Sequence, residues 1–112
     1  MKLLTKEIRN RLPKLYSQEN EEGNAIAYVK FFCPWNQWTW YATEGEPVLD
    51  DAGQEIDFQF FGWVEGLENE MGYFNLSELE YVTGPWGLKV ERDLYWSARP
   101  LKEIDSYKDK WF

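Results

Sequence analysis

A run of aromatic residues at Tyr28–Glu46 restricts the fold more than any other stretch of this chain. Two short aromatic segments there flank Cys33–Gln37, which is typical of a hairpin turn because proline fixes its own φ and asparagine tolerates unusual backbone angles. In the second segment, Trp38–Thr43, bulky apolar residues alternate with hydroxyl-bearing ones, as on the two faces of a strand. We therefore expect a hairpin with one strongly apolar face, which is either part of a core or the floor of a binding surface.

The abundance of aromatic residues fits an ordinary core. The chain has 112 residues, including seven each of Trp, Tyr and Phe. At about 150–250 Å² per side chain, these residues account for about a third of the surface that one domain of this size buries. Core packing is therefore favoured for Trp40, whereas Trp35 stands beside a proline in the turn and is the better candidate for exposure. The length indicates a single domain spanning residues 1–112.

The charges are unevenly distributed along the chain. The net charge is −8, from 20 acidic and 12 basic residues, and there is no histidine. No Lys or Arg stands between Lys30 and Lys89, an interval with 11 acidic residues that we call the acidic block, residues 44–80. Such a block repels phosphate backbones and anionic membranes and attracts basic proteins or divalent cations. We expect a protein partner with a basic surface, and neither direct nucleic-acid binding nor membrane binding.

The composition excludes most common enzyme classes. Without histidine, Ser-His-Asp and Cys-His catalysis are excluded unless Lys or a carboxylate serves as the base, and the usual zinc sites are excluded as well. The single cysteine, Cys33, cannot form an intramolecular disulfide, and no glycine-rich phosphate-binding motif is present. We assign no catalytic residue, no metal ligand and no cofactor. The N-terminus has no signal-peptide pattern and no apolar run reaches membrane-spanning length, so we expect a cytoplasmic protein.

The remaining pattern predicts an α+β domain. We expect a mainly antiparallel sheet of four to five strands, a short N-terminal helix and one or two further short helices. A second helix should begin at Asn75, which can cap it, with Glu78 three positions later as in a capping box. Leu101, Ile104 and Tyr107 recur at helical spacing in the tail. The expected elements are a helix at 5–12, strands at 25–32, 38–43, 57–65 and 71–74, a helix near 76–82, loops at 18–24 and 45–55, and a short strand at 88–90.

Polar and aromatic residues suggest two kinds of binding site. Trp35 and Trp40, followed by Glu44, resemble platforms on which aromatic faces stack on sugars or cations while carboxylates take the polar groups. The carboxylates from Glu44 to Asp57 could hold Mg²⁺ or Ca²⁺, but their spacing does not match an EF-hand loop, so a solvated loop is favoured.

A second charged group, Glu91-Arg92-Asp93, has two interpretations. Arg92 could clamp a carboxylate or a phosphate. The favoured alternative is an ion pair that attaches the last part of the chain to the sheet.

Three ordered motifs carry a resemblance to a known family. They are Thr39-Trp40 with Thr43-Glu44, then Leu76-Ser77-Glu78-Leu79, and then Gly87-Leu88 followed by Val90–Leu94. Together with LLTKEI near the start and EMGYF before the second motif, they resemble the bacterial domain of unknown function 2958. The resemblance covers residues 2–101 and leaves 102–112 as a C-terminal tail. Cys33 departs from it, since threonine is common at that position.

The resemblance implies a small soluble protein that is often encoded on plasmids and other mobile genetic elements and has no established activity. We expect a non-enzymatic protein-binding module, acting against a nucleic-acid-binding host defence protein if the acidic block imitates phosphate charge. The alternatives are a small carboxylate- or metal-dependent enzyme, a small-ligand-binding protein, and an oligomer. We hypothesise one surface that joins Thr43 and Glu44 to the two other polar groups, Ser77-Glu78 and Glu91-Arg92-Asp93.

Overall fold

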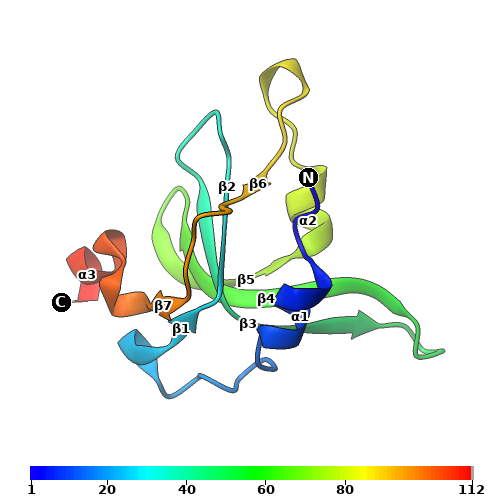
Figure 1. Cartoon of the computed structure of the whole chain (residues 1–112), viewed down its shortest axis with the longest axis horizontal. Coiled ribbons are helices and arrows are strands. Elements are labelled where there is room, and N and C mark those ends of the chain that lie inside the picture. Colours follow the sequence, from blue (N-terminus) through cyan, green and yellow to red (C-terminus); the bar gives the residue numbers. More distant parts are fainter. Residues whose placement is uncertain (112) are drawn as a thin grey trace.

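The computed structural model describes residues 1–111 and has two antiparallel sheets with short helices around them (Figure 1). Five strands form the main sheet in the order β5-β4-β3-β2-β6, and β1 pairs with β7 in a separate small sheet. The α+β class is therefore confirmed. The elements in chain order are α1 (Lys6–Arg11), η1 (Glu22–Asn24), β1 (Ile26–Ala27), β2 (Val29–Phe32), β3 (Thr39–Leu49), β4 (Glu55–Glu65), β5 (Asn69–Asn75), α2 (Leu76–Tyr81), η2 (Pro85–Gly87), β6 (Glu91–Arg92), β7 (Arg99–Pro100), η3 (Leu101–Glu103) and α3 (Asp105–Trp111).

The predicted helix near the N-terminus is confirmed. Thr5 caps α1, since its hydroxyl accepts a hydrogen bond from the backbone N–H of Ile8 at 3.2 Å. The helix ends at Arg11, with Leu12 in an extended conformation before Pro13, because the residue before a proline avoids helical angles. Arg9 forms an ion pair with Glu55 at 2.5 Å, so a basic residue of this helix does meet the acidic block.

The main hairpin is longer than the sequence indicated. The expected loop at 45–55 is wrong in extent, because β3 continues to Leu49 and β4 begins at Glu55. The turn itself is short: Asp50 accepts backbone hydrogen bonds from Ala52 at 2.9 Å and Gln54 at 2.8 Å. Gly53 supplies the positive φ of 81° that the turn requires. The polar composition of this segment reflects exposure at the end of the hairpin rather than loss of strand pairing.

The second helix begins as expected. Asn75 and Glu78 form the capping box of α2, with the backbone N–H of Asn75 donating to Glu78 Oε1 at 2.9 Å. The strand predicted at 88–90 is wrong in position: Lys89 forms an isolated bridge with Thr83, and the strand that joins the main sheet is β6, Glu91–Arg92. Before them, a tight turn at η2 carries Trp86 with a φ of 54° and a side chain that is 98% exposed.

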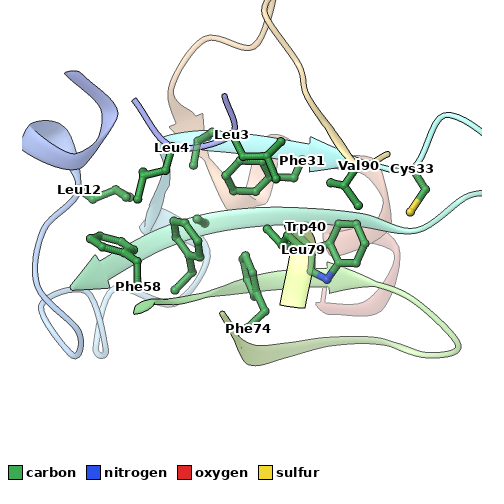
Figure 2. Packing of buried hydrophobic residues seen from close by; sticks show 13 residues of the cluster. Leu3, Leu4, Leu12, Phe31, Cys33, Trp40, Phe58, Phe74, Leu79 and Val90 are labelled. Carbon is green, nitrogen blue, oxygen red and sulfur yellow. The ribbon is translucent and has the colours of Figure 1, made fainter. Parts of the chain in front are cut away.

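Two hydrophobic cores lie on opposite faces of the main sheet. The first core packs the N-terminal segment and α2 against one face; Figure 2 shows Leu3, Leu4 and Leu12 lying over the strands that carry Phe31 and Phe58. The second core packs the C-terminal elements against the other face and consists of Ala25, Ala27, Tyr41, Trp63, Leu101, Ile104 and Tyr107. The spacing of Leu101, Ile104 and Tyr107 in the sequence is thus explained by their burial in the second core.

Candidate functional site

A β-bulge in β3 positions the candidate site. Ala42 pairs with Gly62 and Glu44 with Phe61, so Thr43 is an extra residue in the strand register, and its hydroxyl donates to the Phe61 carbonyl at 3.1 Å. Such an insertion interrupts the alternation of faces. As a result Glu44 lines the same side of the sheet as Thr43, although the two are adjacent in sequence. Thr43 is 1% exposed and Glu44 is 2% exposed.

The buried carboxylate of Glu44 orders the segment that follows α1. Its Oε1 accepts from the backbone N–H of Tyr16 at 2.7 Å, and its Oε2 accepts from that of Gln18 at 2.8 Å. Glu46 accepts from the N–H of Leu15 at 3.0 Å. Tyr16 has a φ of 72°, which is uncommon for a residue with a side chain and occurs where the surroundings impose it. Two acidic side chains therefore hold three backbone donors of this loop.

Gln18 completes the attachment of the loop to the bulge. Its Nε2 donates to the carbonyl oxygen of Thr43 at 2.8 Å and to that of Ile26 at 3.1 Å. Its Oε1 accepts from the N–H of Ile26 at 2.7 Å. The carbonyl of Thr43, which the bulge removes from strand pairing, thus accepts a hydrogen bond from Gln18, as buried backbone groups require a partner.

A cavity of about 530 Å³ lies between this loop and α3. Its size falls within the usual range of small-ligand sites, and its lining is aromatic with a few polar groups, as such sites commonly are. One wall comes from β3, β4 and β5, the second from residues 16–25, and the third from α3. The lining residues are Tyr16, Gln18, Glu19, Glu22, Gly23, Ala25, Thr43, Glu44, Phe61, Met71, Tyr73, Tyr107 and Trp111.

Two tyrosines of the cavity lining, Tyr73 and Tyr107, have a raised pKa. Hydrogen bonding with Tyr16 raises the pKa of Tyr73 to about 12, with added contributions from the charges of Glu44 and Glu19. Burial raises the pKa of Tyr107, and the charge of Glu22 adds to this effect. Each acidic residue of the lining therefore opposes the formation of a phenolate nearby.

The chain was compared with models of protein families. The family described as "Protein of unknown function (DUF2958)" matches residues 3–110. The chain belongs to this family. The match continues past residue 101, where the resemblance read from the sequence ended, so nearly all of α3 lies within it. No curated protein and no solved structure matches the chain.

In this DUF2958 protein, two of the predicted site residues line the cavity, namely Thr43 and Glu44. Trp40 is 8% exposed and belongs to the first core, as the sequence favoured. Trp35 is half-buried and packs against the first core, with its ring so close to Gly84 that a Cβ there would lie 2.3 Å from it.

The predicted pair Ser77-Glu78 has a structural role at the start of α2. Asp57 Oδ2 accepts from the Ser77 hydroxyl at 2.5 Å, and Oδ1 accepts from the Ser77 N–H at 3.1 Å. Burial opposes ionisation of Asp57, but these bonds and others outweigh it and hold its pKa below the usual value. This arrangement attaches α2 to β4.

The predicted group Glu91-Arg92-Asp93 lies at the other edge of the main sheet. Arg92 donates to the backbone carbonyls of Lys2 and Leu3, and Asp93 pairs with Lys30 at 3.6 Å. The interpretation as a structural attachment is therefore supported. Because β6 and β5 are opposite edges of the sheet, the structure does not join the three polar groups into one surface. The hypothesis of a single surface is therefore wrong.

Most carboxylates of the acidic block form hydrogen bonds with other residues of the protein. Seven of its 11 carboxylates accept hydrogen bonds from other residues: Glu44, Glu46, Asp50, Glu55, Asp57, Glu65 and Glu78. These bonds run to several different elements. Within residues 1–111, no group of three or more Cys, Asp or Glu residues is placed to hold a metal ion, and no helix has the length and apolar character of a membrane span.

Sequence reasoning missed most of the cavity lining. Residues 18–24 form a polar loop, as their composition predicts, but the composition does not show that Gln18, Glu19 and Glu22 line a cavity. Trp111 also lines the cavity, although it lies in the C-terminal tail that the resemblance does not cover. One signal was available: Phe61 is one of the aromatic residues that occupy the second face of β4, where an ordinary single-sided sheet would expose polar residues.

Proposed function

We propose that this DUF2958 protein is a non-catalytic binding module, and that the cavity between residues 16–25 and α3 is its ligand site. One observation carries the proposal: the wall of this cavity is built around a buried carboxylate, Glu44, that orders the loop above it. A preformed aromatic cavity of this volume has the properties of a ligand pocket.

The polar groups of the cavity favour binding over catalysis. A general base needs a pKa near the working pH, and the pKa values of Tyr73 and Tyr107 are shifted upwards, away from it. Both oxygens of Glu44 already accept backbone hydrogen bonds. Cys33, the one thiol, belongs to the first core on the opposite face of the sheet, where burial raises its pKa.

A basic protein partner and a mobile-element context in a bacterial cytoplasm remain parts of this proposal. We do not extend it to phosphate mimicry. A mimic needs solvated carboxylates in rows, whereas most carboxylates of the acidic block are engaged in internal hydrogen bonds.

A ligand screen by thermal unfolding tests the proposal. The panel contains cationic, neutral and anionic small molecules. Each is tested with the unchanged protein and with two variants of it. We expect at least one ligand to raise the melting temperature, by about 10 °C at a hundredfold excess over its dissociation constant. Trp111→Ala should weaken this effect, because Trp111 lines the cavity and is 58% exposed, so its removal leaves the cores intact.

Trp86→Ala is the matched control, since Trp86 is 98% exposed and lies outside the cavity lining. It should leave binding unchanged. The proposal is contradicted if no ligand of the panel stabilises the protein, or if Trp86→Ala abolishes the effect and Trp111→Ala does not.

A further inference from the structure

The cavity has charge of one sign. Among the described residues that line it, Glu19, Glu22 and Glu44 are acidic and none is basic. Glu19 and Glu22 are exposed at its rim, whereas Glu44 is buried in its wall. A low-dielectric cavity lined by carboxylates attracts cations and repels anions.

Aromatic rings surround this charge at several angles. The rings of Tyr16 and Tyr73 meet edge to face, with centroids 6.4 Å apart and planes at 63°. The rings of Phe61 and Tyr73 lie 4.8 Å apart at 55°. Rings inclined in this way present both faces and edges to the cavity, which is also bordered by Tyr107 and Trp111. Aromatic faces carry negative potential and attract ammonium and guanidinium groups.

The protein already places a cation beside one of these rings. The Nζ of Lys110 lies 5.8 Å from the ring centroid of Trp111 and is held by the carbonyl of Asn69 at 2.5 Å. The negative potential of the cavity is also felt by Tyr73 and Tyr107: besides hydrogen bonding at Tyr73 and burial at Tyr107, the charges of nearby glutamates raise the pKa of each phenol. The potential that opposes a phenolate is the one that stabilises a bound cation.

We propose that the ligand of this cavity is an organic cation, an ammonium or guanidinium group on an apolar stem. The inference rests on the proposed function, since it names the ligand class of the same site. The rings contact the apolar parts and the charged head, while the rim carboxylates complete the charge balance. The head group comes either from a free small molecule or from a basic side chain of a peptide, and the two sources share this chemistry.

A comparison of isosteric ligands tests the ligand class. Calorimetric titration is carried out with choline, with its neutral isostere 3,3-dimethylbutan-1-ol, and with short capped peptides containing one Arg or one Lys. We expect a cation to bind at least about tenfold more tightly than its neutral isostere, since this factor corresponds to one or two cation–aromatic contacts. Binding should weaken as salt is added.

Matched charge variants locate the effect. The double variant Glu19→Gln with Glu22→Gln removes two rim charges, and the control Glu68→Gln with Glu80→Gln removes two exposed charges outside the lining. The first should lower cation affinity several-fold, and the second should leave it unchanged. Equal losses in both variants would overturn the inference, because attraction by net charge alone explains them.

The outcomes separate this inference from the proposed function. Equal affinity for choline and its isostere overturns the cation inference while leaving the cavity as a ligand site. Absence of binding by choline and by both peptides also overturns it, and the wider ligand panel then decides on the site itself. Tight binding of a free cation and tight binding of a peptide both support the inference and identify the source of the head group.

Discussion

The hydrogen bonds of Glu44 compensate for its burial and also shape the cavity. A buried carboxylate is costly unless it is hydrogen-bonded, and here the backbone N–H groups of Tyr16 and Gln18 provide that compensation. The same two bonds hold the loop that forms one wall of the cavity. One side chain therefore contributes to both stability and the shape of the site.

Replacement of Glu44 tests this double role. Glu44→Ala leaves two part-buried backbone donors without their partner and a void where the buried side chain was, so we expect a loss of about 2–4 kcal/mol in the free energy of unfolding. Urea titration followed by tryptophan fluorescence measures the loss. Glu70→Ala, an exposed acidic position, should change the free energy by less than about 0.5 kcal/mol. A loss at Glu44 no larger than the loss at Glu70 contradicts the role.

Asp57 gives a prediction for acid stability. Its pKa is lower in the folded state, so its contribution is fully present above the unfolded pKa of about 3.9 and is lost as the pH falls through the folded pKa. Asp57→Asn should therefore cost about 1 kcal/mol at pH 7 and progressively less below about pH 4. Melting temperatures of both proteins from pH 7 to pH 3 measure this. Asp51→Asn, in the exposed turn, should show no such convergence.

At the scale of elements, close contact between β3 and β4 beside the bulge depends on glycine. A Cβ at Gly62 would lie 1.7 Å from the carbonyl oxygen of Tyr41, whereas a Cβ at Gly72, its cross-strand partner in β5, would meet nothing within 4 Å. The two glycines therefore have different roles despite their pairing.

We expect Gly62→Ala to destabilise the protein by more than about 3 kcal/mol or to prevent folding, because backbone atoms must move to relieve the clash. Gly72→Ala should be neutral or slightly stabilising, because alanine restricts the unfolded chain more than glycine does. Soluble yield and urea midpoints compare the two variants. Similar midpoints for both would show that the strands adjust freely around the bulge, contrary to this account.

The elements were more predictable from the sequence than the site. Local rules sufficed for α1 and α2, because their caps and apolar spacing lie within a few residues of each other. They failed for Glu44, whose orientation depends on a bulge that a strict two-residue alternation does not include. The cavity combines three segments distant in sequence, and a single sequence does not show which of them meet. The sequence shows that Glu91–Asp93 is charged but not what it contacts. The partners of Arg92 and Asp93, which are Lys2, Leu3 and Lys30, follow only from the topology.

At the scale of the molecule, one sheet separates two cores, and the cavity lies on the side of the second core. Trp63 of β4 joins that core to α3: its ring lies 5.0 Å from that of Tyr107, and its Nε1 donates to Ser106 at 2.8 Å. Both cores include residues of β3 and β4, so we expect them to unfold together.

Leu79→Ala in the first core and Leu101→Ala in the second test this cooperativity, since both leucines are fully buried. Each variant should lose about 2–5 kcal/mol. In both, the transitions seen by far-ultraviolet circular dichroism and by tryptophan fluorescence should coincide. Separate transitions in Leu101→Ala would mean that α3 detaches before the sheet unfolds.

The most direct test of the central claim is a two-dimensional NMR titration of the isotope-labelled protein with each ligand of the panel, choline and its neutral isostere included. We expect saturable shifts at the amides of residues 16–23, 43–44, 71–73 and 107–111, which surround the cavity. Saturable shifts confined to other surfaces, such as the turn that carries Trp86, would contradict the claim. So would the absence of saturable shifts at the cavity with every ligand of the panel.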